Sequence, residues 1–404
     1  MRSRIGQPEL LKEINRASAL DILIQTRVLS RPQLAERTGL SRATIAILVD
    51  ELLQIGLVRE YGLGDSGGGR PPLLMEFNPD AALALGARMR DGAWGIVITN
   101  LDAQVIHHLD ISIPDRSPAA AVRTLCDGVR TIMAQADAAR ILPAIGVGTP
   151  GLVDVHSGVI TSAVDMGWFA VPIRDMVEQA LGMRTFVANR SKVGALAELW
   201  CGVHPDVKDI IYVSIGTGIA AGIVHDGQLY VGVNSSAGEL GHVTILPDGP
   251  LCPCGNRGCL QQLASGPAIA NRARERLRDP GASILRSLVG DHPEWVTPQT
   301  VFAAAEQGDA LALEIVTEAA RYVGIAVANL VNLFNPQLVV IGGPVGQVGQ
   351  VLMDPLRDEV RRRAMAYPLS AVEIVTSNLG AYAGAIGAAV LVLQQASELI
   401  FAKK

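Results

Sequence analysis

The chain has 404 residues, more than one hydrophobic core usually spans, and its composition of 49% hydrophobic but only 4% aromatic residues predicts two or three α/β domains. No apolar run approaches the roughly 18 to 20 residues that cross a bilayer, and the N-terminal residues lack a signal-peptide pattern, so a soluble cytoplasmic protein without a membrane partner is expected. The net charge of −5 excludes tight nucleic-acid binding through bulk charge alone, because even residues 1–76 carry ten Lys and Arg against nine Asp and Glu.

Three helices are predicted in the N-terminal part of the chain. Residues 9–29 repeat apolar side chains at helical spacing and therefore predict an amphipathic packing helix. Ser30 is expected to cap a second helix that ends at Gly39, and Ser41 to cap a third helix from Arg42 to about Leu53. Two helices joined by a short glycine-containing turn are typical of the helix-turn-helix motif.

A wing is predicted after the third helix. Residues 57–60 and 72–77 can pair as two strands around a loop, 62–70, that contains five glycines. With the helices they would form a winged helix-turn-helix domain over residues 1–78. The tip presents Arg70 on a backbone slim enough to enter a minor groove. The alternative is a flexible hairpin tip whose arginine is solvated.

The first turn of the third helix carries the candidate base-contacting residues. Recognition helices present such side chains to base edges, and Arg42 is predicted to contact guanine. Ser41 is expected to cap the helix and reach phosphate, while Thr44 can do either. Arg31 and Arg70 are predicted to contact the DNA backbone and the minor groove. Operator DNA is therefore the expected partner, bound by a homodimer or homotetramer.

The rest of the chain shows an internal repeat. Residues 83–108 and 210–232 each predict strand, glycine-containing turn, strand, aspartate-containing turn and strand. Helices and further strands follow each copy, including residues 144–148 after the first and 338–341 after the second. Two such lobes facing a cleft describe the actin-like, sugar-kinase fold, expected over residues 79–404.

A metal site is predicted inside the second lobe. His242, Cys252, Cys254 and Cys259 offer one imidazole and three thiolates, the ligand set of a tetrahedral zinc ion. Because four protein ligands leave no open position, Zn²⁺ is expected to be structural and to hold the loop 242–259 in shape. The alternative is that these are free cysteines in a glycine-rich loop.

The segments around this cluster resemble the signature of the ROK family (repressors, open reading frames and kinases). Its Glu-x-Gly-His pattern stands at 239–242, followed by Cys-x-Cys-Gly-x-x-Gly-Cys at 252–259. Residues 29–44 look like the DNA-binding extension of the repressor branch. Further segments are similar to the family's sugar, phosphate and adenosine loops: 146–151, 165–168, 216–218 and 341–343. The resemblance covers nearly the whole chain.

This resemblance implies a sugar site in the cleft. In the family the glutamate and the histidine of the signature bind sugar hydroxyls, which assigns this role to Glu239 and to His242, the latter also a zinc ligand. Gly151 belongs to the sugar-lobe loop, and Asn189 stands before the position of the kinases' catalytic aspartate. Gln261 replaces a family glutamate that contacts the sugar, and a glutamine can still hydrogen-bond a hydroxyl.

Two departures from the kinase pattern argue against catalysis. Family kinases place the catalytic aspartate directly after an asparagine, but here Asn189 is followed by Arg190, which cannot accept a proton at neutral pH. In the first phosphate loop, Arg88 occupies the position of an expected aspartate. The sequence therefore predicts a sugar-responsive transcriptional repressor that is not an enzyme. The alternative is a sugar kinase that carries a DNA-binding extension.

The charge of the effector and the sign of regulation are left open. If Arg190 and Arg88 both line the cleft, two guanidiniums replace two carboxylates and favour a sugar phosphate or sugar acid. If each arginine pairs with a neighbouring carboxylate, the sugar is neutral. An activator also fits the sequence, because a winged helix does not encode the sign of regulation. In either case, effector and operator are expected to affect each other's binding reciprocally.

Overall fold

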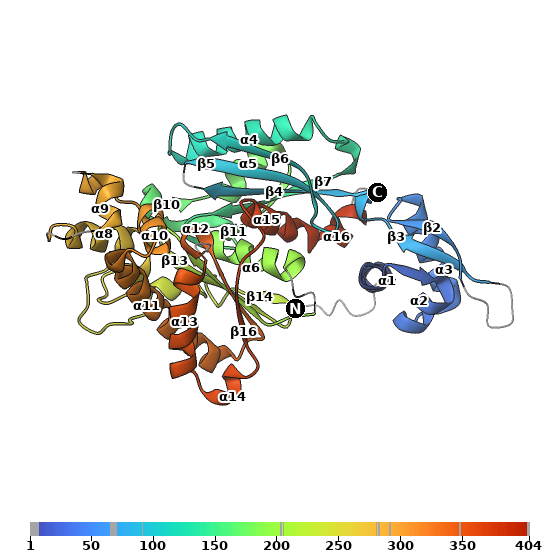
Figure 1. The fold of residues 1–404 in the computed structure, drawn as a ribbon. Helices are drawn as coiled ribbons and strands as arrows, with labels where there is room; N and C mark the ends of the chain where they lie inside the picture. The colour runs from blue at the N-terminus through green and yellow to red at the C-terminus, as the bar shows by residue number, and fades with distance from the viewer. Residues whose placement is uncertain are drawn as a thin grey trace. The chain divides into compact units, whose positions relative to one another are not determined.

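The computed structural model describes residues 8–64, 71–90, 92–202, 204, 206–279, 281, 283–290, 292–346 and 349–401. The chain divides into two compact units: residues 1–147, 174–186 and 388–404 form the first, and residues 148–173 and 187–387 form the second. Groups of helices and strands alternate along the chain, which confirms the predicted α/β class (Figure 1). Among the described helices, none combines the length and apolar character that a membrane span requires.

The first helix, α1 (Pro8–Thr26), ends before the predicted residue 29. Arg27 adopts a φ of +68°, which stops the helix, and Val28–Ser30 continue as strand β1. In β1, Leu29 lies opposite Met75 of β3 (Leu73–Phe77), and both side chains are buried. The prediction was wrong here because a partner far along the sequence buries these apolar residues as a strand.

The predicted helix-turn-helix is confirmed as α2 (Arg31–Thr38) and α3 (Arg42–Gln54). Ser30 caps α2, in a capping box in which the Ser30 hydroxyl accepts the backbone N–H of Gln33 while the Gln33 side chain accepts the backbone N–H of Ser30. Gly39, at a φ of +68°, ends α2 in the left-handed conformation that glycine adopts without strain. The short turn then leads to Ser41, the N-cap of α3.

The wing strands pair as predicted. Strand β2 (Val58–Leu63) runs antiparallel to β3, in a three-stranded sheet of order β1-β3-β2. The tip of the wing with Arg70 lies outside the described residues. The helices and this sheet share an apolar core: Leu23, Leu34, Ile45, Leu48, Val49, Leu52, Leu57, Met75 and Phe77.

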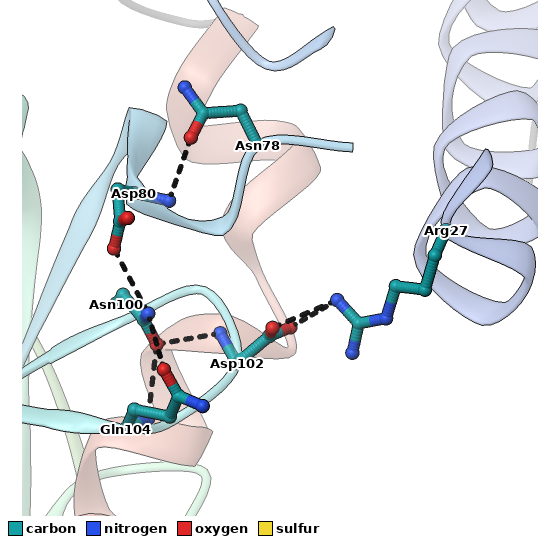
Figure 2. Close-up of polar contacts among 6 residues, drawn as sticks. All are labelled: Arg27, Asn78, Asp80, Asn100, Asp102 and Gln104. Carbon is teal, nitrogen blue, oxygen red and sulfur yellow. Dashed lines mark hydrogen bonds and ion pairs between the residues drawn. The ribbon is translucent and has the colours of Figure 1, made fainter. Parts of the chain in front are cut away.

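Polar contacts anchor this N-terminal segment to the sheet that follows (Figure 2). The Arg27 guanidinium donates to both carboxylate oxygens of Asp102, at 2.6 and 2.9 Å, in the turn after β5 (Ala93–Asn100). Asn78 caps the 3₁₀ helix η1 (Pro79–Ala81) by accepting the N–H of Asp80, whose carboxylate accepts the side-chain amide of Asn100. The turn after β5 therefore contacts the N-terminal segment at two places, Arg27 after α1 and the 78–80 stretch after β3.

A five-stranded sheet of order β11-β7-β4-β5-β6 contains the first copy of the predicted repeat, β4 to β6, as an antiparallel meander. Helix α4 packs on β5 and β6 (Figure 1). The strands of this sheet are β4 (Leu83–Arg90), β5 (Ala93–Asn100), β6 (Val105–Ser112), β7 (Ile141–Thr149) and β11 (Arg184–Asn189). The helices that accompany them along the chain are α4 (Pro118–Met133), η2 (Ala138–Arg140), α5 (Ile173–Leu181), α15 (Ala383–Leu393) and α16 (Ala396–Phe401).

The second copy of the repeat is likewise confirmed, as β12 to β14 in a sheet of order β14-β13-β12-β15-β16 in the second unit. In that sheet β12 runs parallel to β15, and β15 parallel to β16. Its strands are β12 (Ile210–Ile215), β13 (Ile219–His225), β14 (Gln228–Tyr230), β15 (Leu338–Gly342) and β16 (Glu373–Thr376). A small antiparallel sheet of the same unit comprises β8 (Leu152–Asp154), β9 (Val159–Ala163) and β10 (Trp168–Val171).

The helical core of the second unit is built around α11 (Ala310–Phe334), which Asp309 caps at its N-terminus and Asn335, in the left-handed conformation, ends at its C-terminus. In α11, Gly324 lets α13 approach closely, since a Cβ there would lie 2.8 Å from the Leu356 carbonyl oxygen. Figure 1 shows α11 and α13 packed side by side. The other helices of this unit are η3 (Val164–Met166), α6 (Arg190–Cys201), η4 (Leu240–His242), α7 (Leu260–Ala264), α8 (Gly266–Arg276), α9 (Ile284–Val289), η5 (Pro293–Trp295), α10 (Pro298–Glu306), α12 (Gly343–Gly346), α13 (Gln350–Arg363) and α14 (Ala366–Leu369).

Candidate functional site

A cavity of about 430 Å³ opens in the second unit. Its volume lies within the range of small-molecule sites in proteins. The cavity brings together all the residues that the sequence analysis assigns to the effector: Gly151, Asn189, Arg190, Glu239, His242 and Gln261. Its other lining residues are Pro150, Leu152, Ser162, Ala163, Val164, Asp165, Ser191, Ala220, Pro253 and Cys254. Residues separated by more than a hundred positions thus meet around one space.

Asn189 occupies the junction between β11 and α6. Its side-chain oxygen caps the helix by accepting the backbone N–H of Lys192 at 2.9 Å and the hydroxyl of Ser191 at 3.0 Å. The cap fixes the amide plane, so the NH₂ group is the part of Asn189 with hydrogen-bonding capacity toward a ligand. It also makes Arg190 the first residue of α6, at the cavity wall.

Glu239 enters the cavity next to a backbone that only glycine permits. A Cβ on Gly241 would lie 2.2 Å from the Ile219 carbonyl oxygen, so Gly241 lets η4 lie directly against β13. Burial raises the pKa of Glu239, and its electrostatic interactions, that with the Lys192 ammonium first, oppose this rise. Within the cavity wall, Glu239 is a carboxylate suited to accept hydrogen bonds from ligand hydroxyls.

Lys192 is a buried cation behind the cavity that the sequence analysis missed. It is 1% exposed, and its ammonium donates to the carbonyl oxygens of Ser235 at 2.9 Å and Ala237 at 3.2 Å. Burial lowers the pKa of Lys192, while the charge of Glu239 opposes this effect. Lys192 therefore tethers the loop that leads to Glu239. A lysine directly before the apolar run 193–197 of α6 is the signal that could have revealed it.

The predicted metal ligands converge next to the cavity. The ligand atoms of His242, Cys252, Cys254 and Cys259 all lie within 4.8 Å of one another. The Sγ atoms of Cys254 and Cys259 are 3.7 Å apart, and Cys252 Sγ lies 3.6 Å from His242 Nδ1. Tetrahedral coordination with metal–sulfur bonds of about 2.3 Å and metal–nitrogen bonds of about 2.0 Å requires separations of roughly 3.8 and 3.6 Å. The cluster has the spacing of a four-coordinate metal site.

The backbone and its neighbours support this cluster. The N–H of Asn256 lowers the pKa of Cys254 to about 7, which favours the thiolate that a metal needs. Gly258, at a φ of +64°, lets the loop close, since a Cβ there would lie 1.6 Å from the Leu246 carbonyl oxygen. The Gln261 side chain donates to Cys252 Sγ at 3.6 Å and also lines the cavity. Metal cluster and cavity therefore share a wall.

The two arginines considered for the effector site lie in different units of the chain. Arg190 lines it together with the carboxylates of Asp165 and Glu239. Arg88 lies on β4 in the first unit, opposite Gly95 of β5, and is not among the described residues that line this cavity. The wall of the cavity thus contains both signs of charge.

The candidate DNA-contacting residues lie at the start of α3 and beside it. Ser41 and Arg42 are exposed, and Thr44 is half-buried. Ser41 Oγ accepts the N–H of Thr44 at 3.1 Å and lies 2.9 Å from its hydroxyl, so the two side chains support one another. Arg31 pairs with Asp50 of α3 at 2.6 Å, which fixes its guanidinium beside the exposed face of that helix.

Comparisons with known proteins agree on one relationship. A profile of the ROK family matches residues 92–395. The xylose repressor of Caldicellulosiruptor bescii is 31% identical over 392 residues, which are 96% of this chain and 98% of the relative. The crystal structure of a ROK family transcriptional regulator, a homologue of the E. coli MLC protein, matches with a TM-score of 0.85 at 28% identity and covers 97% of this chain and 98% of its own. A ROK family glucokinase from Streptomyces griseus, solved with glucose and AMPPNP, matches with a TM-score of 0.69 at 29% identity over 77% of this chain and 99% of its own.

Proposed function

We propose, because the chain belongs to the ROK family, that it is a sugar-responsive transcriptional repressor. Residues 1–78 act as the DNA-binding domain, and residues 79–404 bind the effector. The observation that carries this proposal is the pairing of a capped, exposed recognition helix with a cavity that collects the predicted effector residues. The similarity to the xylose repressor over nearly the full length of both chains supports it.

The cavity binds its ligand without phosphoryl transfer. Arg190 is the first residue of α6 and lines the cavity, at the position where family kinases are expected to hold their catalytic aspartate. A guanidinium stays protonated at neutral pH and cannot take the proton of a sugar hydroxyl. A coupled ATP-consumption assay across a panel of hexoses and pentoses tests this step. Turnover with any sugar would favour the kinase alternative.

The metal at the cluster is zinc. One imidazole and three thiolates at tetrahedral spacing fit Zn²⁺, and four protein ligands leave no open position for a reacting molecule. When bound, the ion cross-links the loop 242–259 and thereby holds His242 and Cys254 in the cavity wall. Its role is structural.

The effector is an uncharged sugar. The carboxylates of Asp165 and Glu239 line the cavity with Arg190, so the wall presents no uniform positive charge to a phosphate. Isothermal titration of each sugar against its phosphate ester distinguishes the two classes. Tighter binding of the phosphate ester, lost in Arg190→Ala, would show that the effector is anionic instead.

Repression requires two DNA-binding domains in register. Because the N-terminal segment carries little net charge, one copy binds DNA weakly and a homodimer or homotetramer supplies the second half-site. Effector binding then shifts the two domains out of register and releases the operator. Fluorescence anisotropy with the DNA upstream of its own gene tests the whole proposal. Salt-dependent binding that one sugar releases supports it, and binding that a sugar strengthens would indicate an activator.

A further inference from the structure

The recognition helix α3 has two chemically different faces. Its inner face is apolar and buried: Ile45, Leu48, Val49 and Leu52. Its outer face carries Arg42, Ala43 and Asp50, all exposed, and among them lies Ile47 with 60% of its surface exposed. The structure describes every residue of α3, and Ile47 is the only exposed large hydrophobic side chain in it.

Folding does not explain an isoleucine at this position. Isoleucine forms helices less readily than alanine, lysine or glutamate, because its branched Cβ restricts the side chain against the preceding turn. At 60% exposure, Ile47 regains little of that cost through burial. A single exposed apolar residue is ordinary on a protein surface. This one, however, stands on the exposed face of the helix that also carries Arg42 at its start.

We propose that Ile47 is a specificity-determining residue that contacts the C5 methyl group of a thymine in the major groove. This inference rests on the proposed DNA binding and extends it to a particular base. Thymine alone presents a methyl group in the major groove, and aliphatic side chains recognise it by apolar contact. Ile47 and Ala43 are one helical turn apart and share a face, so together they form a small apolar surface.

The spacing along α3 places this thymine relative to the guanine assigned to Arg42. Ile47 is five positions after Arg42, which corresponds to about 7.5 Å along a helix axis. Because successive base pairs are about 3.4 Å apart, the two contacts read bases about two steps apart when the helix lies along the groove. The expected half-site therefore contains a guanine and a thymine at that separation.

The surroundings of Ile47 fit DNA better than a second protein chain. A stable protein interface buries about 800 Å² on each partner, and its core is apolar. Along the helix, Ile47 instead has the cationic Arg42 before it and the ion pair of Arg31 with Asp50 after it, so the exposed apolar surface is confined to Ile47 and the small Ala43. In the major groove, the positive charge of Arg42 and the N-terminus of α3 would face phosphates, and the small apolar surface of Ile47 would face one methyl group.

The test removes a single methyl group from the DNA. The probe is the tightest-binding duplex that the full-length protein selects from a random-sequence library. Each thymine of the probe is replaced in turn by deoxyuridine, which lacks only the C5 methyl group. We expect one substitution to weaken binding of the wild-type protein about four-fold, the value for one buried CH₂-sized group. The Ile47→Ala protein should bind the unmodified probe more weakly than the wild type does, by a similar factor. It should bind the deoxyuridine probe as tightly as it binds the unmodified probe.

A matched control is available in the same segment. Ile14 of α1 is 55% exposed, so Ile14→Ala removes the same atoms from a similar environment away from α3. It should keep both the affinity and the deoxyuridine sensitivity of the wild type. Because Ile47 is exposed and alanine favours helix, Ile47→Ala should melt at or slightly above the wild-type temperature, which excludes a folding defect.

The outcomes separate this inference from the function on which it rests. If the library yields a duplex but no deoxyuridine substitution weakens wild-type binding, the role of Ile47 is overturned while DNA binding stands. The same follows if Ile47→Ala retains the full sensitivity to the substitution. If the protein selects no duplex at all, both the inference and the proposed repressor function fail.

Discussion

The recognition helix and the ligand cavity use side chains in opposite ways. Along α3 the candidate contacts come from neighbouring residues, and Ser41 and Arg42 both face solvent. The cavity draws its wall from segments between Pro150 and Gln261 and includes the largely enclosed Asn189, which is 5% exposed. On the DNA-reading surface, one residue can be replaced without moving its neighbours. In the cavity, the position of each side chain depends on contacts with several others. Substitutions should therefore act locally on α3 and collectively at the cavity.

The largest effect is expected from loss of the metal cluster. Cys259→Ala removes one of four ligands, so the ion should be lost and the cavity wall at His242 and Cys254 should no longer be held. We expect no detectable zinc by elemental analysis, no measurable sugar binding by calorimetry, and operator binding that no sugar releases. Cys126→Ala is the matched control, since Cys126 is also buried but lies outside the cluster. A Cys259→Ala protein that still binds sugar normally would show that the two sites are independent.

Glu239→Gln should be the most damaging single change inside the cavity itself. The charge of the carboxylate strengthens its hydrogen bonds with hydroxyls, so its loss should weaken sugar binding by about 1.5 to 3 kcal/mol. Affinity for operator DNA without sugar should not change. Calorimetry measures the first quantity and anisotropy the second. A sugar affinity unchanged by this substitution would remove Glu239 from the binding site.

On the DNA side, Arg42→Ala should act alone. Loss of a bidentate contact to guanine is expected to cost about 1 to 3 kcal/mol and to relax the base preference at one position of each half-site. Sugar binding should stay at the wild-type value. The exposed Arg361 of α13 provides a control in Arg361→Ala, which removes the same charge elsewhere. Equal weakening by both variants would mean that Arg42 contributes only its charge.

The smallest effect on stability, but a specific one on regulation, is expected for Asp102→Asn. The pair that Asp102 forms with Arg27 is partly exposed, so it contributes at most about 1 kcal/mol to stability. It is nevertheless one of the contacts that anchor the N-terminal segment to the β5–β6 turn (Figure 2). We expect nearly normal binding of sugar and of operator separately, with a smaller change of operator affinity on adding sugar. An unaltered response to sugar would show that this contact does not transmit the signal.

The two regions also differ in how much the sequence could predict. The caps at Ser30, Gly39 and Ser41 are local signals, and each lies where the sequence placed it. The end of α1 was predicted wrongly because the burial of Leu29 depends on Met75, far along the chain. Nearest-neighbour patterns carry no information about such partners.

At the cavity, the family signature predicted which residues meet but not how they are held. Asn189, Glu239 and His242 line one space as the resemblance implied. Lys192 was missed because its role depends on the backbone carbonyls of Ser235 and Ala237, which no side-chain pattern reveals. The wing tip with Arg70 lies outside the described residues, so its contact with DNA stays a prediction.

A repressor that responds to sugar must couple its effector site to its DNA-binding site in both directions. Sugar affinity is measured by calorimetry for the free protein and for the protein saturated with operator DNA, and operator affinity is measured with and without saturating sugar. If the cavity controls the recognition helix, operator must change the sugar affinity by some factor other than one. Sugar must change the operator affinity by the same factor, because linkage between two binding equilibria is symmetric. If the protein binds both sugar and operator but neither ligand changes the affinity for the other, it is not a sugar-responsive repressor.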